Sequence, residues 1–385
     1  MAVTTFKICP RILNGCGSFY GHIAEEAAAL NGRRVFLVCD PILAKLGLTD
    51  KTAALLREKG FAVEIHADVE PEPRVESVLA AAGQARDFGA DCVIGIGGGS
   101  SLDTAKTCSV LLGNQQDIRE LYGIEKVARP GAPLILVPTS AGTGSEVTDI
   151  AILSDEAAQL KMGIVSRHML PASVILDPEL TLSLPKGPTA ASGMDALIHA
   201  MEAYTSVHAT PLTDMWAEHA IALIAPNLRR AWAHGDDIQA RQAMLTGSFY
   251  AGVAFCNAGV TAVHAFAYPI GARYHIPHGM ANTLMLLPVF RFNIGGNAER
   301  FARLAAMLGE DTAGLNTEQA AARCLDALER LARDLQMPRH LAEYGVTADD
   351  VPELASSVLQ VTRLLANNPR TVSEQDAAAI YQEAL

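Results

Sequence analysis

The feature that most constrains the fold of this chain is a change of pattern near its middle. Up to about residue 183, short apolar runs alternate with amphipathic stretches, as strand and helix do in a parallel sheet. After the Leu-Pro-Lys-Gly-Pro segment at 184–188, long segments rich in Ala and Leu follow, without the β-branched alternation of strands. We therefore expect an α/β domain at residues 1–186, followed by an all-helical domain at residues 187–385.

The expected elements follow from this pattern. In the first half we expect strands at 34–39, 61–66, 91–96, 134–137 and 174–176, and helices at 50–59, 74–88 and 101–112. In the second half we expect helices at 190–204, 214–228, 237–254 and 317–335. Half of the 385 residues are hydrophobic, which is enough to form two sizeable cores.

The charge balance argues against two classes of partner. The formal net charge is -12 and no run of Lys or Arg occurs, so we expect neither a nucleic acid nor an anionic membrane surface as a partner. The first fifteen residues lack the basic start of a signal peptide, and no apolar run approaches the ~20 residues of a membrane span. Seven scattered cysteines without a C-x-x-C pair suit reduced thiols. Together these features predict a cytoplasmic protein.

A glycine-rich loop follows the third expected strand, where residues 95–100 have the sequence Gly-Ile-Gly-Gly-Gly-Ser. Glycines between a strand and a helix let backbone N–H groups approach a pyrophosphate at the helix N-terminus. The loop departs from the usual dinucleotide fingerprint, because Ser100 stands where the third glycine would be. A tight connection without a ligand is the alternative. Polar residues in the next helical turn, Ser101 and Asp103 among them, favour a phosphate site.

Two further features follow expected strands. The loop at 138–146 is rich in hydroxyls and glycine, so it can supply donors to a cofactor, although a solvated loop is the alternative. Asp40 ends an apolar strand, where a carboxylate can accept hydrogen bonds from an adenosine ribose and repel a 2′-phosphate. That placement predicts NAD over NADP. A helix N-cap or an Asp-Pro turn is an equally ordinary role for Asp40.

One Asp and three His are candidates for a metal site. Asp195 and His199 are four residues apart in a helical segment, so their side chains share one face. His264 lies in a second helical stretch and His278 follows it. Three imidazoles and one carboxylate can hold a divalent ion and leave a position open for a substrate oxygen. The expected chemistry is Lewis-acid catalysis of hydride transfer.

Two alternatives to this metal site remain open. A buried His is more often a hydrogen-bonded core residue than a ligand. We expect Pro269 and Pro277 to turn the chain back and so bring His278 near the others. His275, three residues before His278, could take its place, and spacing alone does not choose between them.

Taken together, these motifs resemble the iron-containing, group III alcohol dehydrogenases, which share a fold with glycerol dehydrogenase and dehydroquinate synthase. The likeness covers nearly the whole chain and consists of several long motifs in the correct order. They lie at 97–106, 138–148, 177–181 with 184–185, 193–199, His264, 278–279 and 368–370. The likeness implies that the α/β domain at residues 1–186 binds a dinucleotide and that the all-helical domain at residues 187–385 binds a metal.

The resemblance implies roles for individual residues. The implied metal ligands are Asp195, His199, His264 and His278, with His275 as a neighbour. The implied cofactor-binding set is Asp40, Gly97, Gly98, Gly99, Ser100, Asp103, Thr139, Thr143, Ser145 and Lys161, with Asp40 at the adenosine ribose and Lys161 near the nicotinamide. Phe255 matches a position that lines the substrate pocket. The implied cofactors are NAD and a divalent metal, Fe(II) first and Zn(II) as the alternative that the general affinity order favours.

The chain departs from the family at one position. The family usually has a His four residues after the position of His264, beside the nicotinamide, and here that residue is Tyr268. A phenol can donate and accept hydrogen bonds, but its unperturbed pKa is ~10. We take Tyr268 and His275 as candidate catalytic residues. Asp149 lies where pocket residues are expected and would suit a polar or cationic substrate, although a surface position is the more ordinary expectation.

The leading hypothesis is an NAD(H)-linked, metal-dependent alcohol dehydrogenase or aldehyde reductase that acts on a small primary alcohol or diol. One alternative is metal- and NAD-dependent lyase chemistry on a sugar phosphate, which would need a cluster of Lys and Arg that the helical half does not display. The other alternative is a non-catalytic homologue that retains metal and NAD. We expect a homodimer or a larger homo-oligomer.

Overall fold

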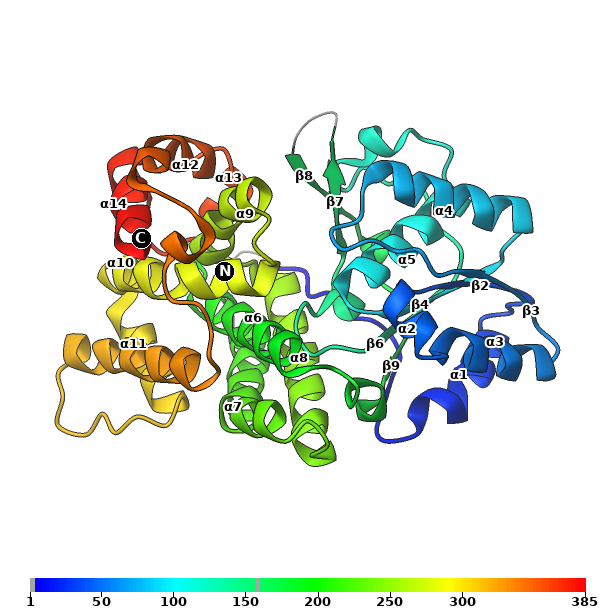
Figure 1. The fold of residues 1–385 in the computed structure, drawn as a ribbon, viewed down its shortest axis with the longest axis horizontal. Coiled ribbons are helices and arrows are strands. Elements are labelled where there is room, and N and C mark those ends of the chain that lie inside the picture. Colours follow the sequence, from blue (N-terminus) through cyan, green and yellow to red (C-terminus); the bar gives the residue numbers. More distant parts are fainter. Residues whose placement is uncertain (1–3, 157–159) are drawn as a thin grey trace. The chain divides into compact units, whose positions relative to one another are not determined.

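The computed structural model describes residues 4–156 and 160–385, which belong to two compact units (Figure 1). The first unit comprises the chain up to Ser140 together with Gly144–Ser183, and the second comprises Ala141–Thr143 together with Leu184–Leu385. Each unit has a hydrophobic core of its own.

A six-stranded parallel sheet organises the first unit. Its strand order is β1-β9-β6-β4-β2-β3. The strands are β1 (Ile12–Asn14), β2 (Arg34–Val38), β3 (Ala62–His66), β4 (Cys92–Gly97), β6 (Leu134–Pro138) and β9 (Ser173–Leu176). All five strands predicted for this half are present, and β1 is an addition. The predicted fold class, a parallel α/β unit followed by helices, is confirmed.

Helices cover both faces of this sheet. Successive residues of β2 alternate between two cores: Val35 and Leu37 face one, whereas Phe36 and Val38 face the other. Helices α1 (Ser18–Ala29) and α3 (Leu48–Glu58) pack into the first core, and α4 (Val75–Phe88) and α5 (Gly99–Gly113) into the second (Figure 1). This burial explains why β2, β4, β6 and β9 are almost entirely apolar, whereas the edge strand β3 contains Glu64 and His66.

The strand order places a crossover point between β2 and β4. From β2 the chain passes through the short α2 (Pro41–Lys45) and α3 to β3 on one side, and from β4 it passes through α5 towards β6 on the other. Where neighbouring parallel strands send their connections in opposite directions, their carboxyl ends leave a crevice that binds ligands in open α/β sheets. Asp40 follows β2 and the glycine loop follows β4, so both lie at this point.

A second, smaller sheet was not predicted. It contains β5 (Gly123–Ile124), β8 (Leu160–Val165) and β7 (Ile150–Asp155), and β7 and β8 pair antiparallel. Short 3-10 helices lie at Ile118–Leu121, Ser145–Val147, Arg167–Met169, Pro178–Thr181, Leu341–Tyr344 and Ala348–Asp350.

The second unit is built from helices. They are α6 (Lys186–Thr205), α7 (Pro211–Ala233), α8 (Ile238–Ala258), α9 (Ala262–Tyr274), α10 (His278–Met307), α11 (Thr317–Asp334), α12 (Val351–Val358), α13 (Thr362–Leu365) and α14 (Glu374–Ala384). Helix α6 packs against α7, α8 and α10, and every residue from Gly193 to Thr205 is buried. Polar side chains on this part of α6 therefore need partners inside the protein.

One sequence-based expectation for this unit is wrong. Pro269 does not turn the chain, because α9 continues through it to Tyr274. A proline inside a helix removes one hydrogen bond, but the neighbouring Phe266 and Ile270 are buried in the core, which holds the helix together. The turn lies at His275, whose φ of 53° is left-handed, and at Pro277, which precedes α10.

No single helix in the described ranges has both the length and the apolar composition needed to cross a bilayer. Only α8 and α9 taken as a pair reach that composition, and they meet at 102°. The seven cysteines all lie within the described residues and are free thiols.

Glu146 is a buried acid beside the second loop of the first unit. Its Oε1 has no hydrogen-bond partner in the described part of the chain. Burial raises the pKa of Glu146 to about 7, although a backbone hydrogen bond and the charge of Lys106 oppose the rise. Lys106 itself is buried and donates to Thr148 and to the carbonyl of Ile150.

We predict that Glu146→Gln stabilises the protein above pH 7. The carboxyl group ionises near 4.5 when exposed and near 7 when folded. Ionisation of Glu146 therefore favours the unfolded chain. The free energy of unfolding is highest below about pH 4.5 and falls until the pH has risen through about 7. Gln keeps the side chain neutral. Denaturation of the metal-free protein should give equal stabilities for variant and wild type at about pH 4, and a variant more stable by about 1–3 kcal/mol at about pH 8. A constant difference between the two proteins would contradict this account.

Candidate metal centre and cofactor site

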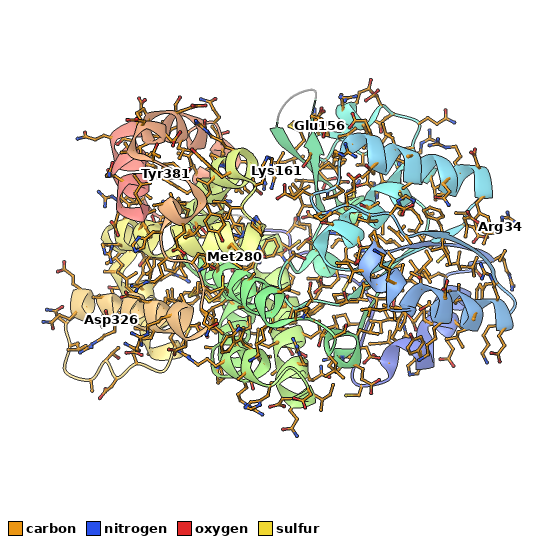
Figure 2. The ribbon with its side chains drawn as sticks, viewed as in Figure 1. Arg34, Glu156, Lys161, Met280, Asp326 and Tyr381 are labelled. Carbon is orange, nitrogen blue, oxygen red and sulfur yellow. The ribbon has the colours of Figure 1, made fainter. Side chains whose placement is uncertain are left out.

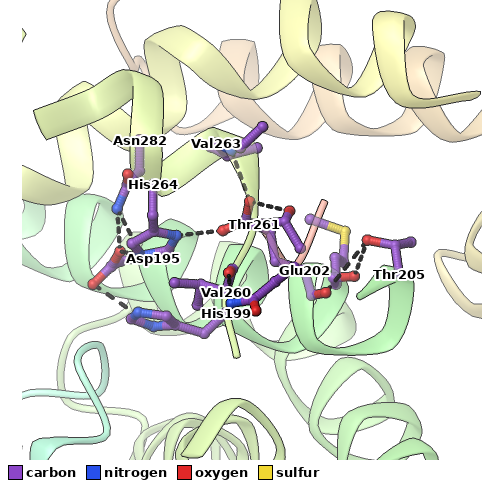
Figure 3. Close-up of polar contacts among 12 residues, drawn as sticks. Asp195, His199, Glu202, Thr205, Val260, Thr261, Val263, His264 and Asn282 are labelled. Atoms are coloured by element: carbon purple, nitrogen blue, oxygen red, sulfur yellow. Dashed lines mark hydrogen bonds and ion pairs between the residues drawn. The ribbon is translucent and has the colours of Figure 1, made fainter. Parts of the chain in front are cut away.

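Four predicted ligands come together inside the helical unit. Asp195 and His199 lie on α6, His264 lies on α9, and His278 is the first residue of α10. One ligand atom from each residue lies within 4.8 Å of all the others. The first three side chains are buried and His278 is partly exposed (Figure 3 shows the first three).

Asp195 is at the centre of the group. Its Oδ1 lies 3.6 Å from His264 Nε2 and 3.7 Å from His278 Nε2, and its Oδ2 lies 3.9 Å from His199 Nδ1. The rings of Phe255 and His264 both stack on that of His199, with centroids at 4.3 Å and 4.5 Å. The predicted pocket residue Phe255 thus contacts the cluster directly and fixes one imidazole.

Hydrogen bonds behind the cluster direct two of the imidazoles. His264 Nδ1 contacts Glu202 Oε2 (Figure 3). His199 Nδ1 lies 3.3 Å from the carbonyl of Gly142. A ring nitrogen that donates to such an oxygen leaves the other nitrogen, Nε2, with a free lone pair. The sequence analysis missed Glu202. It lies seven residues after Asp195, two helical turns along the same face, so the spacing did contain the signal.

Asn282 is a second residue that the sequence analysis missed. Its Nδ2 lies 2.7 Å from Asp195 Oδ1 and 3.1 Å from the Nε2 atoms of His264 and His278. A primary amide has only two hydrogens for these three acceptors. The Oδ1 of Asn282 is buried without a partner in the described residues. The centre therefore has more lone pairs than hydrogens, and this donor set fits a divalent cation.

The ionisable side chains of the cluster shift one another's pKa values. Burial opposes ionisation of Asp195, but the nearby His199, His278 and His264 outweigh it and hold its pKa well below the ordinary range. Burial lowers the pKa of His199 to about 4, despite the attraction of Asp195. For His264 burial acts in the same direction, but Glu202 and Asp195 dominate and raise its pKa to about 9. The carboxylate at the centre is therefore ionised at neutral pH.

The two candidate catalytic residues are placed differently. His275 is exposed at the end of α9 and does not belong to the four-residue cluster. Tyr268 lies one turn after His264, with its ring centroid 6.3 Å from that of His278. Burial raises the pKa of Tyr268, and a hydrogen bond with Arg363 of α13 opposes the rise. Arg363 is ninety-five positions away in the sequence, and no local pattern connects it with Tyr268.

The glycine loop has the geometry of a phosphate-binding turn. Gly97 has a φ of 147°, and a Cβ there would lie 2.5 Å from Ser101 Oγ. Helix α5 begins at Gly99, and no described side chain caps it at Gly98. Its first N–H groups are therefore available to an anion, and the positive end of the helix dipole points the same way.

Asp40 has one of the roles considered for it, that of a helix N-cap. Its Oδ1 accepts hydrogen bonds from the N–H groups of Ile42 and Leu43, so it is the N-cap of α2. Its Oδ2 faces the glycine loop, since a Cβ built on Gly97 would lie 3.3 Å away. One oxygen stabilises the helix and the other lies beside the crossover point.

The second loop is tied to the glycine loop. Thr139 N–H donates to the carbonyl of Gly97 at 3.0 Å. Ser145 donates its hydroxyl to Asp103 Oδ1 at 2.5 Å, and the other oxygen of Asp103 accepts from Ile152 N–H at 2.9 Å. Asp103 thus positions Ser145 from inside the unit. Of the predicted cofactor set, only Thr143 belongs to the second unit.

Glu72 connects two other predicted cofactor residues. Its N–H donates to Ser100 Oγ at 3.2 Å, and its carboxylate forms an ion pair with Lys161 at 2.6 Å. Lys161 lies on β8 of the small sheet (Figure 2). The sequence analysis did not include Glu72.

The expectation for Asp149 needs correction. Its residue exposure is only 4%, and it forms an ion pair with Lys7, so the more ordinary expectation of a surface position is wrong. A carboxylate can be buried there because Lys7 neutralises it.

Comparison with known proteins identifies the family. The family described as iron-containing alcohol dehydrogenase matches residues 9–178, and its C-terminal domain matches residues 189–385. The chain is 42% identical to the long-chain-alcohol dehydrogenase 1 of Geobacillus thermodenitrificans, over 94% of this chain and 92% of that one. The chain belongs to the iron-containing alcohol dehydrogenase family. The family inferred from the sequence motifs is thus confirmed.

Two further relatives agree with this membership. The sulfoacetaldehyde reductase of Bilophila wadsworthia is 39% identical, over 97% of this chain and 96% of that one. A crystal structure of a 1,3-propanediol oxidoreductase has a TM-score of 0.97 and 39% identity, and the match covers 100% of both chains. This iron-containing alcohol dehydrogenase is therefore an oxidoreductase with alcohol dehydrogenase or aldehyde reductase activity. Neither the lyase nor the non-catalytic alternative has support among these relatives. Family membership implies a divalent metal and NAD.

We predict that the centre distinguishes His278 from His275. His278→Ala should remove most of the metal from protein purified without chelators, because only three of the four ligands remain. His275→Ala is the matched control, three residues away and outside the cluster, and it should retain the metal. Elemental analysis of both variants tests this. If the His275 variant lost its metal and the His278 variant kept it in full, His275 would be the fourth ligand in place of His278.

Proposed function

We propose that this enzyme is a metal-dependent, NAD(H)-linked dehydrogenase of small primary alcohols or diols that also reduces the corresponding aldehydes. The observation that carries this proposal is the acceptor-rich centre of Asp195 and three imidazoles. We assign Fe(II) as its first occupant on the family's description and Zn(II) as the alternative.

In this proposal the four ligands hold the metal. A divalent cation in the centre supplies Lewis acidity that draws charge from the substrate oxygen. Asp195 is ionised and central, so it contributes most of the negative charge. Asn282 fixes the orientation of that carboxylate through its Nδ2. Phe255 packs on His199 and excludes water from that side of the centre.

The proposed NAD site lies at the crossover point of the first unit. The N–H groups at the start of α5 suit the pyrophosphate, and Gly97 allows the backbone to approach it closely. Asp40 Oδ2 is the proposed acceptor for the ribose hydroxyls. Thr139 and Ser145 lie on the loop that is anchored to this turn. We propose the Thr139 hydroxyl as an additional donor to the cofactor, and the Ser145 hydroxyl, which donates its hydrogen to Asp103, as an acceptor.

The substrate class rests on the relatives as well as the centre. Their names include a long-chain alcohol, 1,3-propanediol and sulfoacetaldehyde. The last two are small molecules that react at a terminal carbon, which agrees with a small primary alcohol or diol. The cytoplasmic location and the homodimeric or larger assembly remain predictions from the sequence.

The deciding experiment is a turnover assay with metal analysis. Protein purified without chelators should contain about one metal per chain, and it should form NADH from primary alcohols and consume NADH with the matching aldehydes. Chelation should abolish both reactions, and added Fe(II) or Zn(II) should restore them. Equal turnover by fully metal-free protein would contradict the proposal.

We predict that Asp40→Asn relaxes the cofactor preference. Asn is as good an N-cap as Asp, so α2 should keep its stability. The amide lacks the charge that repels a 2′-phosphate, so the ratio of kcat/KM for NAD to that for NADP should fall by about tenfold or more. Asp40→Ala is the comparison, because it loses the cap too and should cost about 1 kcal/mol of stability. A wild type that already uses NADP as well as NAD would overturn this role for Asp40.

We predict that Tyr268 takes part in proton transfer. Tyr268→Phe should lower the rate of alcohol oxidation by about tenfold or more, as expected for one acid/base group, and should alter its pH dependence. Metal content and NAD affinity should stay unchanged. Identical pH–rate profiles with equal maximal rates would restrict Tyr268 to shaping the pocket.

Arg363 supplies a matched variant for the same question. Because its hydrogen bond and charge lower the pKa of Tyr268, Arg363→Met should raise that pKa. The ascending limb of the pH–rate profile should then move to higher pH. In the Tyr268→Phe background, Arg363→Met should produce no such shift.

A further inference from the structure

The N-terminus of α9 is capped by a side chain from another helix. Thr261, the N-cap residue, makes no side-chain cap of its own. Glu202, on α6, accepts a hydrogen bond from Thr261 Oγ1 at 2.5 Å and from Val263 N–H at 2.7 Å, both with Oε1 (Figure 3). This single oxygen therefore takes the place of the missing cap.

The other oxygen of Glu202 has a separate partner. Its Oε2 contacts Nδ1 of His264, one residue after Val263. Glu202 is fully buried, so water does not compete for either oxygen. One carboxylate thus fixes both the start of α9 and the imidazole that this start carries.

We propose that Glu202 is a positioning residue for metal binding, acting through His264. A neutral imidazole can carry its hydrogen on either nitrogen, and only the nitrogen without hydrogen can bind a metal. By accepting the hydrogen of Nδ1, Glu202 leaves the lone pair on Nε2, the atom that lies 3.6 Å from Asp195. The carboxylate also makes Nε2 a stronger ligand. This inference rests on the proposed metal centre.

The position of Glu202 on α6 strengthens the argument. Asp195, His199 and Glu202 are spaced by four and three residues, so they share one face of a helix that is buried along this stretch. Two ligands and the residue that orients a third are therefore held by one rigid element. The geometry of the centre does not depend on a loop at this point.

Glu202→Gln separates orientation from capping. The Gln carbonyl can still accept from Val263 N–H, so α9 keeps its cap. Its amide, however, donates towards His264 Nδ1, which then must accept and leaves the hydrogen on Nε2. We expect Zn(II) to bind about 10- to 100-fold more weakly in competition with a chelating dye. The absorption spectrum of the Co(II)-loaded variant should also differ from that of the wild type.

Thr261→Val is the matched control. It removes a hydrogen bond to the same carboxylate, but on Oε1, and leaves the contact with His264 in place. Its Zn(II) affinity and Co(II) spectrum should equal those of the wild type, even where its thermal stability falls. Equal weakening in both variants would overturn the proposal, because Glu202 would then act only as a cap.

The remaining outcomes separate this inference from the function on which it rests. If the wild type binds no Zn(II) or Co(II), the proposed metal centre itself is wrong. If the wild type binds both and Glu202→Gln binds them equally well, only the role of Glu202 is wrong. Should Glu202→Gln fail to fold, wild-type protein labelled with ¹⁵N-histidine decides the question by NMR. We expect His264 of the Zn(II)-bound protein to keep its hydrogen on Nδ1 and to bind the metal through Nε2, whereas binding through Nδ1 with the hydrogen on Nε2 would overturn the proposal.

Discussion

The helical unit depends on one constraint, the burial of two carboxylates on a helix that is enclosed along half its length. Asp195 and Glu202 lie on the interior face of α6, and neither can be hydrated there. The starts of α9 and α10 are therefore placed to bring His264 and His278 to Asp195. The close approach needs small residues. A Cβ on Gly279, at the start of α10, would lie 2.3 Å from the carbonyl oxygen of Ala191 on α6.

The two units use opposite electrostatic solutions. In the first, the start of α5 offers N–H groups and a positive helix dipole beside a glycine turn, which suits the anionic pyrophosphate of a dinucleotide. In the second, lone pairs outnumber hydrogens, which suits a cation. Each site needs a ligand of the opposite charge, and an alcohol dehydrogenase of this family requires both. In our proposal the carboxylate of Asp40, which lies beside this turn, disfavours the 2′-phosphate of NADP.

The sequence predicted those strands and helices that have a clear pattern of apolar residues. The strands β2, β4, β6 and β9 were found because they are almost entirely apolar runs, whereas β1, β5, β7 and β8 are short or only half apolar. β3 was found although Glu64 interrupts its apolar run and only Val63 is buried. Pro269 was misjudged because burial of its neighbours offsets one lost hydrogen bond. The four ligands followed from spacing and family motifs. Glu202 and Asn282 had helical spacing to predicted ligands, but a Glu or Asn in an Ala-rich helix equally suits a solvated face. Arg363 could not be found, since its contact with Tyr268 exists only in the folded chain.

The replacement of the family's His by Tyr268 has different chemical consequences for aldehyde reduction and for alcohol oxidation. A phenol whose pKa burial has raised remains protonated at neutral pH, and Arg363 only partly opposes the rise. In its proposed role such a group donates to a developing oxyanion, as aldehyde reduction requires, without first acquiring a proton. Alcohol oxidation requires the reverse, so the phenolate must form or another base must accept the proton. An enzyme cannot change the equilibrium constant of its reaction, so Tyr268 can affect the two directions differently only in how their rates depend on pH. Aldehyde reduction should already be fast at neutral pH, whereas alcohol oxidation should accelerate as the pH rises.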